Sequence, residues 1–459
     1  MKRVAMLSFV VIAAAVLAGP VQAGELPPAL AAEVDAVVER CLAQDGAPSA
    51  SIAIARDGEL AYAAAFGSAR LAPPEKATVE TRYQLASISK SFTAQALLLL
   101  EQEGKLSLDD PVEHWLPGLS GGKDATIREL LSHTAGYPDH YPQSYPAGPR
   151  GQPTTPDTLI AEWGHHPLLF APGTQWRYSN MNYVIAGRIA EKAGGEPLFD
   201  LMQHRIFTPL GMDRTVDLDK VEADAVGYVR PALASLRPAP AEGAGWSFAA
   251  GQIVTTASDL ARWDAAFLKR RLLSQRQAEE ETTPATLAGG AHAQYALGLF
   301  VSNRDGRTVY SHIGQGLGFL AVNRIYPAEQ AAIIVLTNSS ASAAFRDIAD
   351  QIEFLIVPPT AADAEARKQF AFLQAGAPDR SRFTPDFDAY LDPAMVQAYA
   401  ASLGPLGPLR SFVLRSEEMT DSITARNYDV VAGGHPLSVS MLLVADGRIE
   451  QYIVQDAKR

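Results

Sequence analysis

Strand-like segments occur in two groups that lie far apart in this chain of 459 residues. In the first group, SIAIAR and ELAYAAAF (residues 51–66) flank Asp57-Gly58, a dipeptide favoured in two-residue hairpin turns. The second group begins at residue 296 and contains LGLFVSN, RTVYSH, FLAVNRIY and AAIIVLTN. Because the connections within each group are too short for a helical crossover, they predict antiparallel pairing. We therefore expect an antiparallel sheet of about five strands.

The chain between the two groups, roughly residues 87–251, predicts an inserted region rich in helices and loops. Its first segment, SFTAQALLLLEQEG, is apolar nearly all round, which indicates a buried helix ending at Gly104. MNYVIAGRIAEKAGG and TASDLARWDAAFL also have helical periodicity, and residues 345–355 offer an amphipathic helix to cover the sheet. The expected fold class is α+β, with a cleft between the sheet and the insert as the natural place for a substrate.

The N-terminus has the pattern of an export signal. A basic start, Met1-Lys-Arg, precedes a short apolar stretch, and Val21-Gln22-Ala23 has the small-x-small form of a cleavage site. We expect cleavage after Ala23, a periplasmic or secreted location and no stable membrane insertion afterwards; an uncleaved anchor is the minor alternative. The single cysteine, Cys41, leaves no internal disulfide and is expected to be a small buried hydrophobe.

Composition divides the chain into four parts. Residues 1–23 are the predicted signal peptide, and residues 24–357 form the main domain. Residues 358–382, rich in Ala, Pro and charge, predict a linker or bridging helix. Residues 383–459 contain four more strand-like runs and predict a small antiparallel β-rich domain of unknown role.

The net charge is acidic. It is −12 for the full chain, and removing residues 1–23 takes away two basic residues and no acidic one, which makes it −14. This charge argues against nucleic acid or an anionic membrane surface as a partner. The sequence leaves the oligomeric state open.

Ser87 and Lys90 lie at the start of the buried helix, in QLASISKSF. One helical turn puts residues three apart on the same face, so an amine at Lys90 could take the proton of the Ser87 hydroxyl. A second Ser-x-x-Lys match, Ser120 to Lys123, lies in a Gly-rich stretch without helical periodicity and is interpreted as a loop. Alone, the pattern is weak evidence, because it is short and common.

Two further patches add possible chemistry. Tyr178-Ser-Asn180 precedes a predicted helix and offers a phenol that can carry a proton and an amide that can hold a lysine or a substrate carbonyl. His312-Ile-Gly314, followed by Gln315, lies where repeated glycines end one strand and start the next. The structural alternatives are a helix-entry loop with a buried tyrosine and a hairpin with a surface histidine.

Taken together and in this order, the three patches resemble the serine β-lactamase and penicillin-binding-protein superfamily, in particular its class C-like branch with family VIII esterases and D-amino-acid peptidases. The resemblance covers about residues 30–356. It includes secondary stretches typical of that branch: TIRELLSHTAGYPD, PGTQWRYSNMNYVIAGRI, PLGM and AAGQIVTTASDLARW. These motifs are specific for the fold and poorly specific for the substrate.

The resemblance implies a role for each matching residue. Ser87 would be the nucleophile, Lys90 the base, and Tyr178 would share the proton transfers and protonate the leaving group. Asn180 would position Lys90 and the substrate. The amides of Ser87 and Gln315 would form an oxyanion hole, and His312 and Gly314 would contribute to substrate binding. No metal or organic cofactor is implied.

The sequence departs from the penicillin-recognising pattern at one place. Many relatives have Lys-Thr-Gly or Lys-Ser-Gly where this chain has His312-Ile313-Gly314. A mostly neutral imidazole beside an isoleucine holds a substrate carboxylate less well than an ammonium and a hydroxyl. The expected substrate is therefore a small carboxylic ester, or an amide or peptide with D-residues such as a peptidoglycan-like fragment; a β-lactamase or D,D-carboxypeptidase is the first alternative.

Other classes of protein fit less well. A metal hydrolase would need clustered ligands, but no His-Glu-x-x-His occurs and His165-His166 has no partner at metal spacing. An α/β-hydrolase would show Gly-x-Ser-x-Gly, whereas the nearest stretch, residues 245–249, lacks the last glycine. His133 is expected to close a helix end. A non-catalytic binding or sensor protein remains the alternative from a different class.

Overall fold

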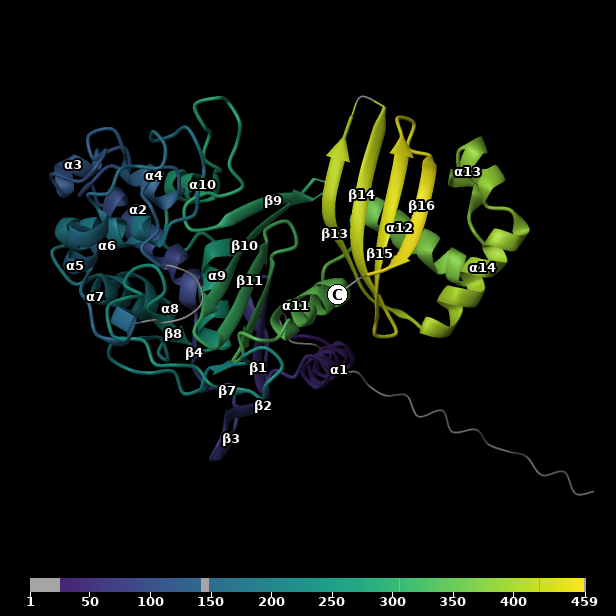
Figure 1. Cartoon of the computed structure of the whole chain (residues 1–459), viewed down its shortest axis with the longest axis horizontal. Coiled ribbons are helices and arrows are strands. Elements are labelled where there is room, and N and C mark those ends of the chain that lie inside the picture. The colour runs from purple at the N-terminus through teal and green to yellow at the C-terminus, as the bar shows by residue number, and fades with distance from the viewer. Residues whose placement is uncertain (1–24, 142–147, 305, 421, 458–459) are drawn as a thin grey trace, which may run out of the picture.

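The computed structural model describes residues 25–141, 148–304, 306–420 and 422–457. The predicted signal peptide lies outside these described residues. Figure 1 shows a larger part, in which helices surround a sheet, beside a smaller part made of the C-terminal strands and their own helices. Among the described residues, the helices are too short or too polar to cross a membrane.

The larger part is built on a seven-stranded antiparallel sheet with the order β3-β2-β1-β12-β11-β10-β9. Strands from the two sequence groups meet at its centre, where Ile52 of β1 pairs with Val335 of β12. The central strands are buried on both faces, which explains their continuous apolar runs. The bounds are β1 Ser49–Arg56, β2 Glu59–Leu71, β3 Pro74–Lys76, β9 Phe300–Arg304, β10 Arg307–Gly316, β11 Phe319–Tyr326 and β12 Ala331–Thr337.

Helices cover both faces of this sheet. On one face, α1 (Pro28–Asp45) and α11 (Ala344–Ile356) enclose a hydrophobic cluster with β1, β11 and β12, and Cys41 is buried in it. On the other face, α9 (Ala257–Leu268) packs against β1, β2 and β12. The Thr256 side chain caps α9 by accepting a hydrogen bond from the backbone N–H of Asp259, the usual arrangement at a helix N-cap. The expected α+β class is confirmed.

The inserted region forms around α2 (Ser89–Gln102), which is buried at every residue from Ser89 to Leu100. The chain turns away after it at Gly104, whose φ of 70° is the left-handed conformation that glycine tolerates. Helix α6 (Asn180–Gly194) packs on α2. The other α-helices of the insert are α3 Val112–Trp115, α4 Ile127–Leu131, α5 Pro156–Trp163, α7 Leu198–Met202 and α8 Thr208–Leu210. Helix α10 (Gln275–Thr282) follows α9 and also packs on α2.

A small three-stranded sheet joins the insert to the larger sheet, and the sequence did not predict it. Strand β8 (Ile253–Thr255) pairs with β4 (Tyr83–Gln84) on one side and with β5 (Val216–Asp217) on the other. The backbone N–H of Leu85 continues the pairing by donating to the Ile253 carbonyl at 2.9 Å. This pairing brings the chain around residue 250 against the segment that carries Ser87.

The C-terminal part has a core of its own. Its four strands pair in the order β13-β14-β15-β16, with bounds Leu409–Met419, Ile423–Ala432, His435–Val444 and Ile449–Asp456. Helices α12 (Ala361–Gln374), α13 (Pro385–Tyr390) and α14 (Pro393–Leu403) cover one face of this sheet. Phe370 of α12 is fully buried in the same cluster as Tyr428. The segment expected to be a linker or bridging helix therefore packs with the C-terminal strands.

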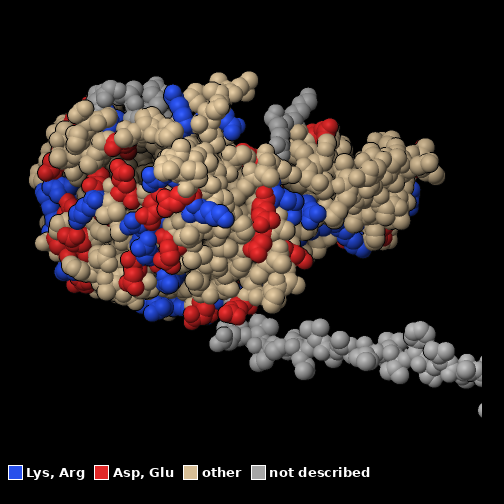
Figure 2. Space-filling view, turned by 90° about the horizontal axis from the view of Figure 1, so that it is seen from below, with Lys and Arg blue, Asp and Glu red and all other residues tan. Residues whose placement is uncertain are grey.

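A buried ion cluster joins the two parts. Asp350 of α11 contacts Arg324 of β11 at 2.6 Å and Arg415 of β13 at 2.8 Å. Burial by itself would raise the pKa of Asp350, but the two arginines hold it below its ordinary value. On the surface, acidic and basic side chains are interspersed over the face seen in Figure 2.

We expect Asp350→Asn to lower the free energy of unfolding by about 1.5–3 kcal/mol, the usual worth of a hydrogen bond to a charged group, because it removes the buried acid that Arg324 and Arg415 share. Arg324 keeps Glu353, and Arg415 keeps Asp429. Asp429→Asn is the matched control, since Asp429 bonds the same Arg415 but its side chain is 60% exposed. Its cost should stay below about 1 kcal/mol. Urea unfolding followed by tryptophan fluorescence measures the stability of both variants. Equal losses would contradict the view that the buried Asp350 contacts hold the two parts together.

Candidate active site

Ser87 lies on a tight turn at the entrance of the buried helix. Residues Ala86–Ile88 form a 3₁₀ turn that leads directly into α2. Ala86 has a φ of 47°, a strained conformation for a residue with a side chain. Ser87 is half-buried while its neighbours Ala86 and Ile88 are buried. The turn therefore leaves the Ser87 hydroxyl accessible while its neighbours are buried.

The Ser87 hydroxyl contacts both groups that the sequence predicted as its partners. Lys90 Nζ lies 3.0 Å from Ser87 Oγ. The Tyr178 hydroxyl lies 2.8 Å from the same oxygen. An amine and a phenol within hydrogen-bond distance of one hydroxyl form a route for a proton to leave it and return.

The Lys90 amine has no exposure to solvent. Besides Ser87, it donates to Asn180 Oδ1 at 2.7 Å and to the Ala250 carbonyl at 2.9 Å. Burial lowers the pKa of Lys90 to about 7, although the charge of Asp139 acts in the opposite direction. A substantial fraction of Lys90 is therefore neutral near pH 7 and able to accept a proton.

Asn180 is the first residue of α6 and is held by Asp139. Asp139 Oδ1 accepts a hydrogen bond from the Asn180 backbone N–H at 3.1 Å. The Asn180 side-chain Nδ2 lies 3.3 Å and 3.2 Å from the two carboxylate oxygens of Asp139. Asp139 ends the stretch TIRELLSHTAGYPD, and no pattern in the sequence predicts a role for it.

Tyr178 packs in an aromatic cluster behind Ser87. The centroids of the Tyr178 and His133 rings lie 4.3 Å apart. His133 follows α4 and has a φ of 62°, which agrees with its expected place at a helix end. Burial lowers the pKa of His133 well below its ordinary value and raises that of Tyr178. Both rings are therefore neutral in the resting site.

Strand β10 passes close to the Ser87 turn at Gly314. A Cβ atom at this position would lie 2.0 Å from the Leu85 carbonyl oxygen, so no larger residue fits without a shift of the backbone. Pairing of β10 with β9 ends at Ser311. Beyond that point, Gln315 and Gly316 line the pocket at Ser87.

The structure places His312 beside the site and not in its wall. Its side chain is buried, and burial together with the charge of Lys90 lowers the pKa of His312 to about 3. Nδ1 donates to its neighbour's carbonyl, that of Ile313, at 2.8 Å, and Nε2 accepts from the Tyr295 hydroxyl at 3.0 Å. Both ring nitrogens are occupied, so the predicted contact between this imidazole and a substrate does not match the arrangement.

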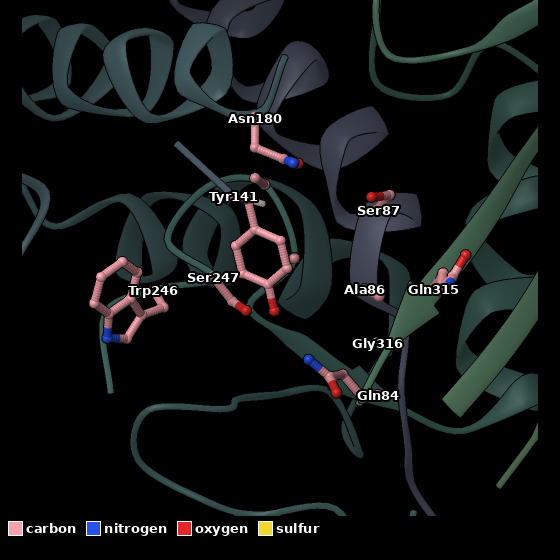
Figure 3. Close-up of a pocket in the computed structure, with 11 residues that line it drawn as sticks. Gln84, Ala86, Ser87, Tyr141, Asn180, Trp246, Ser247, Gln315 and Gly316 are labelled. Atoms are coloured by element: carbon pink, nitrogen blue, oxygen red, sulfur yellow. The ribbon is translucent and has the colours of Figure 1, made fainter. Parts of the chain in front are cut away.

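A pocket of about 380 Å³, including the open solvent at its mouth, lies against Ser87. Figure 3 shows Tyr141 between Asn180 and Ser247, Gln315 on the strand beside Ser87, Gln84 at the lower end of the pocket, and Trp246 on the side of Tyr141 away from Ser87. The described residues that line it carry no formal charge: Gln84, Ala86, Ser87, Tyr141, Asn180, Trp246, Ser247, Ala250, Gly251, Gln315 and Gly316. Within the described residues, there is no group of three or more His, Cys, Asp or Glu side chains that could hold a metal ion.

Several residues around Ser87 were not predicted from the sequence, for three different reasons. The Ala250 carbonyl lies in AAGQIVTT, but a backbone contact has no side-chain signal. Tyr141 and Trp246 lie on loops, where the sequence indicates irregular structure but not direction. Asp139 could have been found only by asking which residue holds the Asn180 amide.

A family model described as Beta-lactamase matches residues 34–357, which is more than half of the chain. The chain belongs to the β-lactamase family. The curated relatives include Penicillin-binding protein 4* of Bacillus subtilis (strain 168), which is 28% identical over 63% of this chain and 67% of its own length. Protein flp of Staphylococcus aureus (strain MRSA252) is 27% identical over 67% of this chain and 62% of its own length.

Solved structures share this fold. A D-stereospecific amidohydrolase from Streptomyces sp. has a TM-score of 0.60 and 29% identity, covering 71% of this chain and 99% of its own. A D-amino acid amidase from Ochrobactrum anthropi SV3 has a TM-score of 0.63 and 26% identity over 72% and 98%. The octameric penicillin-binding protein homologue from Pyrococcus abyssi, at 22% identity and a TM-score of 0.60, shows likeness of fold over 92% of this chain and 99% of its own. Family and neighbours together support a serine hydrolase.

We expect Gly314→Ala to destabilise the protein, because the new methyl group would lie 2.0 Å from the Leu85 carbonyl oxygen. The expected loss in the free energy of unfolding is about 1–3 kcal/mol, the usual cost of overpacking. Gly289→Ala is the control, since its Cβ would meet nothing within 4 Å. Urea unfolding of both variants is the measurement, and equal stability of the two would show that β10 can move away from the turn.

Proposed function

We propose that this chain is an exported serine hydrolase that forms an acyl-enzyme on Ser87 and hydrolyses a carboxylic ester or an amide, including D-amino-acid peptides. The observation that carries the proposal is the pair of contacts at Ser87 Oγ, 3.0 Å from Lys90 Nζ and 2.8 Å from the Tyr178 hydroxyl. These contacts supply a base and an acid at one nucleophile, which is what acyl transfer requires.

In the acylation step, Ser87 Oγ attacks the substrate carbonyl carbon while its proton moves to neutral Lys90. The carbonyl π electrons become an oxyanion, which the backbone N–H groups of Ser87 and Gln315 would stabilise. When the tetrahedral intermediate collapses, Tyr178 gives its proton to the departing alkoxide or amine and regains one from Lys90. The products are the Ser87 ester and the free alcohol or amine.

In the deacylation step, water takes the place of the leaving group. The Lys90 and Tyr178 pair removes a proton from water, which attacks the Ser87 ester and forms a second tetrahedral intermediate. Its collapse releases the carboxylic acid and returns the proton to Ser87 Oγ. Both steps use the same three side chains, and every proton that one of them takes up is returned. The proposed reaction therefore needs no cofactor.

The pocket supports a substrate without a carboxylate at the recognition end. The described residues of its lining carry no formal charge, and both nitrogens of His312 are hydrogen-bonded within the protein. A β-lactam or a D,D-peptide presents a carboxylate that would favour a cationic anchor. Two structural neighbours, a D-amino acid amidase and a D-stereospecific amidohydrolase, also support an amide as the substrate of this chain. A β-lactamase or D,D-carboxypeptidase activity is therefore the second candidate.

Export rests on the N-terminal sequence. The basic start, the apolar run and the cleavage pattern at Ala23 support a cleaved signal and a periplasmic or secreted location. We propose residues 24–357 as the hydrolase domain and leave the C-terminal strands with an unassigned role. If they bind a ligand, the chain could act as a sensor without turnover, which the following experiment tests.

Ser87→Ala should abolish turnover of a short-chain p-nitrophenyl ester and of a D-alanyl amide, with a fall in kcat/KM of at least about a thousandfold. A fluorophosphonate should label the wild-type protein and not this variant. Ser120→Ala is the matched control, since Ser120 begins the other Ser-x-x-Lys pattern and its hydroxyl donates to the His165 carbonyl. It should keep full activity and labelling.

The outcomes separate the candidate functions. Ester or D-amide turnover that depends on Ser87, with slow cleavage of a chromogenic cephalosporin, supports the proposal. Fast cephalosporin turnover favours the β-lactamase candidate. Neither turnover nor labelling of the wild-type protein contradicts a serine hydrolase and favours the binding protein.

The activity should also depend on the charge of Lys90. Because the proton acceptor is the neutral amine and its pKa lies at about 7, kcat/KM should fall as the pH drops below 7 and level off above it. The fall should approach about tenfold per pH unit, as for a single ionisation. A pH profile of kcat/KM with the p-nitrophenyl ester measures this, and a profile that is flat from pH 5 to 8 would contradict Lys90 as the base.

A further inference from the structure

The contacts of Lys90 decide where its lone pair points. A neutral amine has two N–H groups and one lone pair, and Nζ has three near neighbours. Two of them, Asn180 Oδ1 at 2.7 Å and the Ala250 carbonyl at 2.9 Å, have no proton to give and can only accept. The two N–H groups therefore go to these oxygens, and the lone pair faces Ser87 Oγ at 3.0 Å.

This arrangement depends on which end of the Asn180 amide faces Lys90. A carboxamide carries an oxygen and an NH₂ group that can exchange places by rotation. With the NH₂ group toward Lys90, its N–H would donate to the lone pair and compete with the Ser87 proton. The base would then be occupied before the reaction starts.

Asp139 is placed to prevent this rotation. Its two carboxylate oxygens lie 3.3 Å and 3.2 Å from Asn180 Nδ2, and Oδ1 also accepts from the Asn180 backbone N–H at 3.1 Å. A carboxylate only accepts hydrogen bonds, so it would repel the amide oxygen if the side chain turned round. The Tyr141 backbone N–H donates to the same Oδ1 at 3.1 Å and fixes the carboxylate.

We propose that Asp139 is a positioning residue, which holds the Asn180 amide oxygen toward Lys90 and thereby keeps the lone pair of the base directed at Ser87. This inference rests on the proposed function, because it assigns Asp139 a part in the same proton transfer. It does not require that Asp139 touch the substrate.

Asp139 also has a measurable effect on the pKa of Lys90, because few other charges lie near the amine. Buried aromatic rings surround the amine, with Tyr178 and Tyr183 centroids at 4.9 Å and 5.5 Å from Nζ. The nearby His133 and His312 are neutral, because burial lowers the pKa of each. His140, 3.9 Å from Asp139, is neutral as well, since burial lowers its pKa to about 4.

Asp139 is therefore the negative charge that raises the pKa of Lys90 against the effect of burial. Two other charged side chains of this region, Arg150 and Glu242, contact Tyr141 and not Lys90. Arg150 stacks on the Tyr141 ring at 4.1 Å, and Glu242 accepts a hydrogen bond from the Tyr141 hydroxyl.

The test is Asp139→Asn, which keeps the shape of the side chain but removes its charge and gives it an N–H group. The plateau of kcat/KM for the p-nitrophenyl ester should fall about 10- to 100-fold, a loss of the size known for removing the hydrogen-bond partner behind a metal-binding side chain. The low-pH limb should move to lower pH by about one pH unit, because loss of a negative charge favours the neutral amine.

Asp110→Asn is the matched control. Asp110 also accepts from a backbone N–H and a side-chain N–H, those of Ser107 and Trp115, at 3.0 Å and 3.1 Å. It lies away from Lys90, so its replacement should leave both the plateau and the limb unchanged. If Asp139 merely caps α6, Asp139→Asn should lower stability and leave the plateau of kcat/KM of the folded protein unchanged, even though the loss of its charge shifts the limb.

A second pair of variants tests whether Asp139 acts through Asn180. In an Asn180→Ala background, Asp139→Asn should cost less than about threefold in the plateau, because the amide that it holds is already gone. A full and independent loss in that background would overturn the positioning role. Asp139→Glu keeps the negative charge and can only accept hydrogen bonds, so it should restore the low-pH limb of the wild-type profile. A limb like that of Asp139→Asn would also overturn the positioning role.

Failure of this inference is distinct from failure of the proposed function. If the wild-type protein shows no turnover that depends on Ser87, the serine hydrolase is wrong and the Asp139 role falls with it. If the wild-type protein is active and Asp139→Asn keeps its plateau and its limb, only the positioning role is overturned. Circular dichroism of each variant identifies one that fails to fold, and Asp139→Glu then decides the question.

Discussion

The burial of the Lys90 amine is the constraint on which the site depends. A lysine in water is almost fully charged near pH 7 and cannot accept a proton, whereas the amine at Lys90 has no exposure to solvent and its pKa falls to about 7. Burial of this kind is tolerated because carbonyl oxygens and a hydroxyl satisfy all the hydrogen-bonding capacity of Nζ. The enclosing structure, from α2 to the chain at Ala250, keeps water out and these acceptors in place.

The fold meets this constraint by bringing distant segments against one buried helix. Helix α2 supplies Lys90, α6 supplies Asn180, and the chain before β8 supplies the Ala250 carbonyl. Strand β10 reaches the same point from the large sheet, and Gly314 leaves just enough room for the Leu85 carbonyl. At the centre of this sheet β1 and β12 are buried on both faces, so the strands that support the site belong to a close-packed core.

The C-terminal strands stand apart from this arrangement. They have their own hydrophobic cluster, and the buried contacts of Asp350 with Arg324 and Arg415 tie them to the covering helix α11. These contacts lie on the opposite face of the sheet from α9. The turn that carries Ser87 belongs to the insert, so the ion cluster is not part of the site. The likeness of fold to the Pyrococcus abyssi homologue extends over 92% of this chain, so this pairing of parts is not peculiar to it.

The sequence by itself determined six strands of the large sheet, the main helices and the contact between Ser87 and Lys90. Strand periodicity and turn residues predicted β1, β2 and β9 to β12, and helical spacing predicted that Lys90 meets Ser87, because such contacts depend on a few neighbouring residues. Only the tertiary structure decided that the His312 ring is turned inward to Tyr295, that residues 361–374 pack on the C-terminal sheet, and that Asp139 and the Ala250 carbonyl hold the site. These contacts join segments far apart in the chain, and their direction is set by packing, which no local pattern of residues records.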